Sequence, residues 1–124
     1  SEFLPTALIV DEAGMVMEPE IMCPFTLADW QKVILVGDHK QLQPIVLNHQ
    51  AAELGYNVSF FERVATAAQG SASWFPLYLL EQQYRMHPRI SDFPSRFFYG
   101  GKLCDDVSVI CRDTKPVLQV RQRN

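Results

Sequence analysis

The chain has 124 residues, 48% of them hydrophobic, and a formal net charge of −3. This composition can bury a core, so it excludes a chain that is disordered because of its composition. The acidic balance also excludes a global basic field, so any contact with nucleic acid must be local or come from parts outside this chain.

The first predicted element is a strand, Ala7–Val10, followed directly by the carboxylates Asp11 and Glu12. Four consecutive apolar residues predict a strand buried on both faces, as in the middle of a parallel sheet. Ligands of open α/β sheets bind beyond the carboxyl ends of strands, so the two acids are candidates for binding Mg²⁺ and for orienting an attacking water. Taken alone, the same pattern also fits a strand that leads into an ordinary polar loop.

A crossover and a second strand follow. A proline flanked by glutamates predicts a short helix or turn over Pro19–Cys23, and a second helical turn is expected over Thr26–Trp30. Lys32–Val36 repeats the pattern of a buried strand. Two such strands with a crossover between them predict a right-handed β-α-β unit. The polar loop Asp38–Pro44 would then leave the second strand at the same edge as the first pair of acids.

Two further helices are predicted between residues 50 and 69. Gln50–Leu54 forms the first, and Gly55 is expected to stop it. The second covers Phe60–Gln69, because Ser59 and Glu62 have the spacing of a capping box.

The C-terminal part begins with the linker-like stretch Gly70–Ser73. A strand is expected within Trp74–Leu80. Pro88 can open a helix, which Pro94 is expected to restart, and a glycine pair at 100–101 ends it. Val107–Ile110 is predicted to be a last strand.

The aromatic residues of the predicted C-terminal helix are expected to pack in a core. Phe93, Phe97, Phe98 and Tyr99 supply its apolar face. They are not interleaved with basic residues in the pattern of a single-strand binder, so packing is favoured over stacking on bases.

The cysteines Cys23, Cys104 and Cys111 form an odd, irregularly spaced set. They fit neither a disulfide framework nor a zinc site and indicate reduced intracellular thiols. No apolar run reaches membrane-spanning length, and Ser1–Pro5 lacks the basic-then-apolar pattern of a signal peptide. We therefore expect a cytoplasmic or nuclear protein with no membrane partner. A core-type strand that begins almost at once, with no initiator Met, predicts that the chain starts within a domain.

Three stretches carry motifs whose order and spacing are specific to one family: Val10–Gly14, Gly37–Pro44 and Gln83–Pro88. Together they closely resemble the superfamily 1 helicases of the nonsense-mediated-decay type, over most of the chain. The resemblance implies an α/β fold of the RecA-like P-loop NTPase type. This fold is a parallel sheet with flanking helices, and the chain would contain only part of it. Residues 1–70 would be the C-terminal half of a first RecA-like domain. Residues 71–124 would be the junction and the start of a second.

The resemblance also implies a role for each matched residue. Asp11 and Glu12 match a Walker B pair, in which Asp11 binds Mg²⁺ and Glu12 activates the hydrolytic water beside the metal. Gln41 matches a glutamine that senses the γ-phosphate of ATP. Tyr84 matches an aromatic that packs on adenine, and Arg85 matches an arginine that reaches the γ-phosphate from the second RecA-like domain. A planar, permanently charged guanidinium suits a phosphate whose charge shifts during transfer.

Each of these residues also has an ordinary interpretation. The acid pair can be a solvated loop, Gln41 a loop amide, Tyr84 a core aromatic and Arg85 a member of a surface ion pair. Asp38 matches the acid of the motif that contains Gln41, and the resemblance gives it a structural or coupling role.

The sequence contains no G-x-x-x-x-G-K-[ST] loop to cradle the β- and γ-phosphates of ATP. We therefore expect a piece of an ATP-dependent helicase that uses ATP and Mg²⁺, and we expect the isolated chain to be inactive. Its partners would be the remainder of the helicase core and single-stranded RNA or DNA. The alternatives are a non-catalytic, truncated or pseudo-helicase binding module and a different P-loop ATPase. Half a domain would also leave a sheet edge exposed.

Overall fold

The computed structural model describes residues 5–69 and 75–111. The chain divides between Leu77 and Tyr78 into two compact units, which are described separately below. None of the described helices is both long and apolar enough to cross a bilayer.

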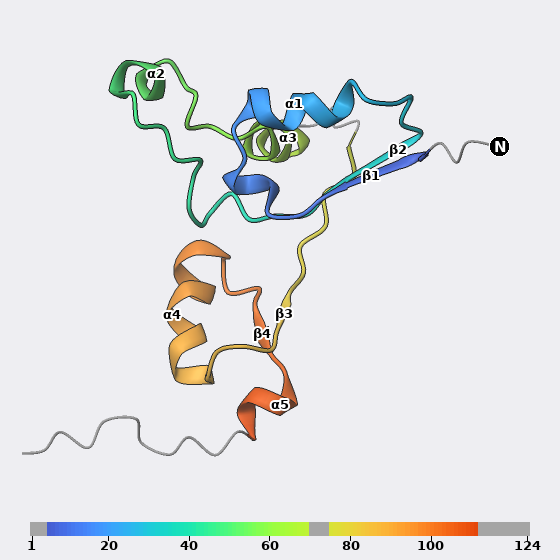
Figure 1. The fold of residues 1–124 in the computed structure, drawn as a ribbon. Helices are drawn as coiled ribbons and strands as arrows, with labels where there is room; N and C mark the ends of the chain where they lie inside the picture. Colours follow the sequence, from blue (N-terminus) through green and yellow to red (C-terminus); the bar gives the residue numbers. More distant parts are fainter. Residues whose placement is uncertain (1–4, 70–74, 112–124) are drawn as a thin grey trace, which may run out of the picture. The chain divides into compact units, whose positions relative to one another are not determined.

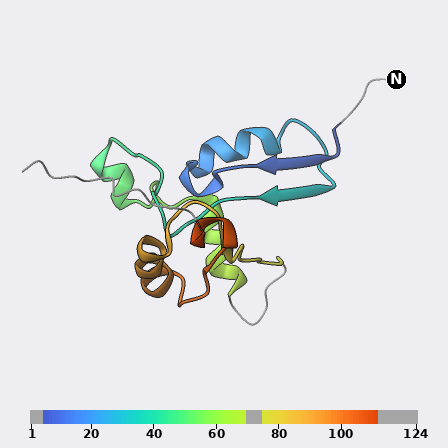
Figure 2. The ribbon, with the colours of Figure 1, turned by 90° about the horizontal axis from the view of Figure 1, so that it is seen from below.

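The first unit is built on two parallel strands, β1 (Ala7–Val10) and β2 (Lys32–Leu35). Helix α1 (Glu18–Phe25) lies in the connection between them and runs alongside the pair (Figures 1 and 2). The strands are in register from one end to the other, since Ala7 is opposite Lys32 and Val10 is opposite Leu35. The predicted parallel β-α-β arrangement is confirmed. Because the two strands run in parallel, their carboxyl ends meet at one edge.

The second helical turn expected over Thr26–Trp30 is wrong. The N–H of Thr26 donates to Cys23 O at 3.1 Å, an i→i−3 bond that tightens and closes the last turn of α1. The indole N–H of Trp30 then donates to Pro24 O at 2.9 Å. This bond uses a carbonyl at the end of the helix, so the chain turns towards β2 and no new helix begins.

Two more helices, α2 (His49–Glu53) and α3 (Phe60–Ala68), confirm their predictions. Ser59 Oγ accepts the N–H of Glu62 at 3.0 Å, which is the cap that the sequence spacing predicted. Gly55 follows α2 with a φ of +93°, a backbone region that favours glycine. Helix α3 packs on the short 3-10 helix η1 (Ala13–Met15).

The packing between η1, α1 and α3 forms the core of the first unit. Ala13, Ile21 and Ala65 are 0%, 2% and 1% exposed. The rings of Phe25 and Phe60 meet edge to face, with centroids 5.9 Å apart. Small residues at this contact allow α3 to approach η1 closely, which fixes the start of the loop that follows β1.

The two strands are not buried on both faces, contrary to the prediction. Ile9 is 65% exposed, Val33 41% and Ile34 49%. In the described part of the chain the sheet has two strands, so neither has neighbours on both sides. The apolar pattern predicts the two strands correctly, but burial depends on covering elements that the described residues do not supply.

The second unit repeats the parallel arrangement on a smaller scale. Strands β3 (Gln82–Gln83) and β4 (Cys104–Asp105) pair in parallel, and helix α4 (Pro88–Phe98) connects them (Figure 1). The strand expected within Trp74–Leu80 is wrong for residues 75–80, which form no ladder, and Trp74 lies outside the described residues. The residues that pair with β4 are Gln82 and Gln83, which lie opposite Cys104 and Asp105.

Helix α4 begins at Pro88 as predicted, but Pro94 lies inside it and does not restart it. Two buried serines, one turn apart, anchor the helix on both sides of the proline. Ser91 Oγ donates to Asp105 Oδ1 at 2.6 Å, and Ser95 Oγ donates to Leu103 O at 3.3 Å. These bonds hold the helix in place across the position where proline lacks an N–H.

The C-terminal strand expected at Val107–Ile110 is also wrong, because these residues form the short helix α5. Asp106 Oδ1 accepts the N–H of Ser108 at 2.8 Å and caps the helix. This cap outweighs the β-branched valines, whose helix propensity is only slightly unfavourable.

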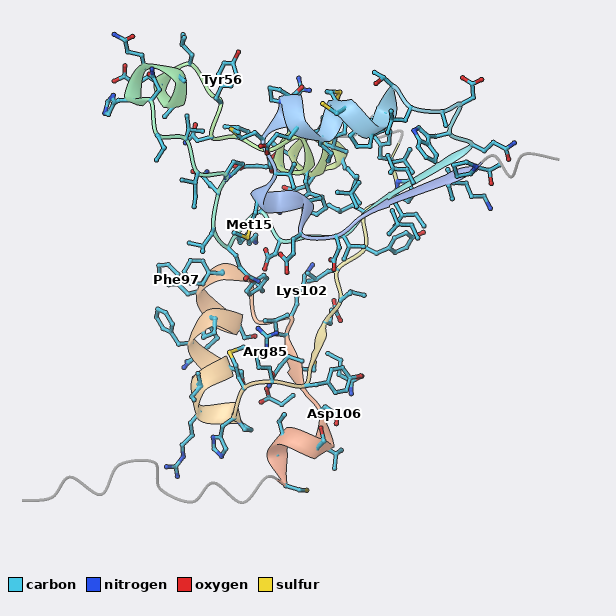
Figure 3. All side chains as sticks on the ribbon, viewed as in Figure 1. Met15, Tyr56, Arg85, Phe97, Lys102 and Asp106 are labelled. Atoms are coloured by element: carbon cyan, nitrogen blue, oxygen red, sulfur yellow. The ribbon has the colours of Figure 1, made fainter. Side chains whose placement is uncertain are left out.

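The expectation that the α4 aromatics lie in a core is wrong in the described structure. Phe93 is 64% exposed, Phe97 71% and Phe98 42%. The rings of Phe93 and Phe97 stack on each other with centroids 5.4 Å apart. Figure 3 shows Phe97 on the side of α4 away from β4, so this face of the helix stays open.

The Ser59 cap gives a first testable prediction. Replacing Ser59 with Ala removes the acceptor for the Glu62 N–H and should lower the free energy of unfolding by about 1 kcal/mol. Urea unfolding of the chain, followed by circular dichroism, measures the change. Thr66→Ala on the exposed face of α3 is the matched control and should have little effect. Equal destabilisation by both variants would contradict the capping role.

Candidate functional site

The loop after β1 is fixed by two hydrogen bonds to a single residue of the neighbouring chain segment. The N–H of Val36 donates to Val10 O at 2.8 Å, and Val36 O accepts the N–H of Ala13 at 2.9 Å. Asp11 and Glu12 lie between these two bonds, so the backbone holds them at the carboxyl end of β1. Both side chains are exposed at this edge.

Glu12 has a left-handed backbone, with φ 53° and ψ 33°. It is the one non-glycine residue with a positive φ in the described part of the chain. This conformation costs about 1–2 kcal/mol for an L-residue. The N–H of Glu12 donates to Asp11 Oδ1 at 2.9 Å, which compensates part of that cost. Such strain is concentrated at functional sites in proteins, so this turn supports a functional interpretation of the acid pair.

A close backbone contact joins the loop after β1 to the loop after β2. A Cβ atom added to Gly37 would lie 2.8 Å from Gly14 N and 3.0 Å from Ala13 N. A Cβ added to Gly14 would lie 2.8 Å from Asp38 O. Real Cβ atoms do not approach backbone atoms so closely, so only glycine at both positions allows the two loops to touch.

The loop after β2 is shaped by Asp38. One carboxylate oxygen, Oδ2, accepts the side-chain amide of Gln41 at 2.6 Å, and the other accepts the N–H of Lys40 at 3.0 Å. The ring of His39 contacts Phe61 of α3 at 6.2 Å between centroids. Gln41 is therefore oriented by Asp38, and the loop that carries it is attached to α3.

The acid pair and the glutamine loop thus come together at one edge of the first unit. Mg²⁺ prefers one or two carboxylates and fills its remaining positions with water and phosphate oxygens, so Asp11 and Glu12 fit this ion. Among the described residues, no group of three His, Cys, Asp or Glu side chains is placed to hold a metal ion.

The glycine contact gives a second prediction. Gly37→Ala should force the two loops apart and lower the free energy of unfolding by about 1–3 kcal/mol, the usual cost of overpacking. Urea unfolding measures this loss. Leu47→Ala, at a side chain that is 97% exposed, is the control and should leave stability nearly unchanged. Wild-type stability in the Gly37→Ala variant would show that the contact is not required.

Tyr84 and Arg85 belong to the second unit and follow β3 directly. Both side chains are exposed, and Figure 3 shows Arg85 extending from this turn. The structure therefore places the loop with Asp11 and Glu12 against the loop with Gln41, and it places Tyr84 and Arg85 on a separate unit.

The turn with Tyr84 and Arg85 is held by Gln83, a residue that the sequence analysis left without a role. Gln83 Oε1 accepts the N–H groups of Arg85 at 2.9 Å and Met86 at 2.7 Å. Gln83 Nε2 donates to Met86 O at 2.7 Å and to Asp105 Oδ1 at 2.5 Å. The only feature of the sequence that pointed to this role of Gln83 was its amide side chain, two residues before Arg85.

Asp105 of β4 connects this turn to α4. Hydrogen bonds from Ser91 and Gln83 lower the pKa of the Asp105 carboxyl, and the nearby His87 lowers it further. The pKa of Asp106 is lowered as well, mainly by hydrogen bonds from Ser108. Nothing in the sequence pattern marked Asp105, because its partners are distant along the chain.

Asp105 gives a third prediction, on pH. Its pKa is lower in the folded chain than in the unfolded chain, so it stabilises the second unit above the unfolded-state pKa. That contribution is lost as the pH falls through the folded-state pKa. Ser91→Ala should raise the Asp105 pKa towards its ordinary value, as measured by carboxyl-carbon NMR titration. The Asp106 pKa, which depends on Ser108, is the internal control. An unchanged Asp105 pKa would show that Ser91 does not stabilise the carboxylate.

Comparison with known proteins identifies the family. Two family models, both described as "AAA domain", match residues 2–49 and 56–124, and the second alone covers more than half of the chain. The chain belongs to the AAA domain family.

Among its relatives, the Regulator of nonsense transcripts 1 homolog of Neurospora crassa is 43% identical over 110 residues, which is 89% of this chain and 9% of the relative. The ATP-dependent helicase NAM7 of Saccharomyces cerevisiae is 42% identical over 102 residues, 82% of this chain and 10% of the relative. The mouse 3'-5' exoribonuclease HELZ2 is 45% identical over 98 residues, 77% of this chain and 3% of the relative.

These matches confirm the resemblance to superfamily 1 helicases of the nonsense-mediated-decay type. The chain spans 3–10% of the length of these three relatives. The short parallel strands with flanking helices agree with an α/β fold.

Proposed function

We propose that this chain is a part of an ATP-dependent helicase or translocase that couples Mg·ATP hydrolysis to movement on single-stranded RNA or DNA. Residues 1–70 would form the C-terminal half of a first RecA-like domain of the P-loop NTPase type. Residues 71–124 would form the junction and the start of a second. The observation that carries this proposal is the Gly14–Gly37 contact, which joins an acid pair to a glutamine loop in a chain of the AAA domain family.

In this proposal the first unit supplies the groups around the γ-phosphate. When bound, Mg²⁺ neutralises charge on the β- and γ-phosphates. Asp11 binds the ion, and Glu12 is a second carboxylate beside it that orients and deprotonates the attacking water. The Gln41 amide donates one N–H to Asp38. Its other N–H and its carbonyl oxygen are then directed to the phosphate and the water.

The second unit supplies an aromatic ring and a cation. Tyr84 is 59% exposed, so its ring has a face on which adenine can pack. Arg85 provides a guanidinium that can stabilise charge on the γ-phosphate as it is transferred. An arginine that completes such a site contributes on the order of 10³–10⁵-fold to turnover.

The nucleic acid would bind through the rest of the helicase core, because this chain has a net charge of −3. The helicase would be cytoplasmic or nuclear. The isolated chain would not hydrolyse ATP, since its sequence contains no G-x-x-x-x-G-K-[ST] loop.

A second candidate is a non-catalytic truncated or pseudo-helicase binding module. The genomic sequence upstream separates the two candidates. An in-frame loop with G-K-[ST] supports the helicase, and a stop codon or unrelated sequence supports the binding module.

The fourth prediction tests the helicase proposal. In the full open reading frame, Glu12→Gln should lower ATP turnover by about 10²–10⁴-fold, because an amide cannot accept the proton of the attacking water. ATPase assays with and without single-stranded RNA and DNA measure the loss, and nucleotide binding should be retained.

Glu53→Gln is the matched control, since Glu53 is an exposed glutamate of α2 that contacts His49. It should leave turnover unchanged. Magnesium-dependent turnover by the isolated chain that Glu12→Gln abolishes would contradict the expected inactivity of this chain. Full turnover in the Glu12→Gln open reading frame would overturn the role of Glu12.

A further inference from the structure

The side-chain amide of Gln83 uses its full hydrogen-bonding capacity. An amide has two acceptor positions on oxygen and two N–H donors. Both acceptor positions are used by backbone N–H groups, those of Arg85 and Met86. Both donors are used by oxygens, Met86 O and Asp105 Oδ1.

Three of these four bonds go to the backbone of the turn that contains Arg85. They fix the peptide groups on both sides of Arg85 relative to β3, so the Cα–Cβ bond of Arg85 starts from a defined position. The fourth bond connects the turn to β4, where Asp105 also accepts the hydroxyl of Ser91 from α4. The turn is thereby attached to both neighbouring elements of the second unit.

No other side chain reproduces this set of bonds. Glutamate has no donor and would face the Asp105 carboxylate, methionine has neither donor nor good acceptor, and asparagine is one methylene shorter. The neighbouring Gln82 makes a different contact. Its Nε2 donates to Asp106 Oδ2 at 2.7 Å. Gln82 is therefore a matched control within the same strand.

We propose that Gln83 is a positioning residue for Arg85, with Asp105 as its anchor. This proposal rests on the proposed function for the role of Arg85 at the phosphate. Because Gln83 fixes the peptide groups on both sides of Arg85, it lowers the entropy that Arg85 must lose to reach a transferring phosphate. Its loss should therefore lower kcat more than it raises the KM for ATP.

The kinetic experiment uses the full open reading frame with Mg·ATP and single-stranded RNA or DNA. Gln83→Met should lower kcat by about 10–100-fold and leave KM within about 3-fold, the size of effect expected when a catalytic group is misplaced by about 1 Å. Gln82→Met should leave both constants unchanged. Adding Gln83→Met to Arg85→Ala should cause no further loss, because Gln83 acts through Arg85.

A paired substitution tests the anchor. Gln83→Glu alone should lower kcat, because it removes both donors and places a carboxylate beside Asp105. Combining it with Asp105→Asn returns one N–H donor to the pair and should recover part of kcat. Additive losses in the Gln83→Met, Arg85→Ala double variant, or no recovery in the paired variant, would overturn the proposal.

Hydrogen–deuterium exchange separates this proposal from the proposed function. In the same full-length protein, Gln83→Met should speed exchange at the amides of Arg85 and Met86, while peptides of α4 stay protected. Unchanged exchange at these amides would overturn the role of Gln83 even in an active enzyme. A wild-type protein without ATPase activity would overturn the proposed function, and the exchange result would still decide whether Gln83 holds the turn.

Discussion

The first unit depends on the contact between the backbones at Gly14 and Gly37. Two parallel strands place their carboxyl ends at one edge, but they do not by themselves press the following loops together. A Cβ atom added to Gly14 or to Gly37 would lie 2.8 Å from a backbone atom of the other loop, so the absence of both side chains allows the loops to touch. The loop with Asp11 and Glu12 is therefore held against the loop with Gln41 by backbone contact, which side-chain motion cannot loosen.

In the second unit, side-chain hydrogen bonds hold the strands and the following turn in place. Its strands β3 and β4 have two residues each, so their ladder gives few backbone bonds. Two amide–carboxylate pairs, Gln82–Asp106 and Gln83–Asp105, add hydrogen bonds across the pair. Hydrogen bonds to an ionised carboxylate are stronger than those between neutral groups. The pKa of Asp105 is lowered mainly by hydrogen bonds from Ser91 and Gln83, and these same bonds attach the turn that carries Arg85 to β4 and α4.

The exposed apolar surfaces show the difference between a hydrophobic pattern and burial itself. Ile9, Ile34, Phe93 and Phe97 are at least 49% exposed, although their pattern predicted core positions. Periodicity and residue type report which element forms and which face is apolar. Burial is a property of the neighbours, and the described residues supply none that cover these faces. An element that covered these faces would gain a free energy of about 25 cal/mol for each Å² of apolar surface that it buried.

The sequence by itself determined the parallel crossover of the first unit, helices α2 and α3, the start of α4 at Pro88 and the helicase-type motifs. These features depend on residues within a few positions of one another, or on the order of motifs along the chain. Only the tertiary structure decided that α4 continues through Pro94, because Ser91 and Ser95 bond to Asp105 and Leu103. It also decided that Gln83 holds the arginine turn. The physical reason is distance along the chain: the bond from Gln83 to Asp105 joins residues 22 positions apart, and no local pattern records such a partner.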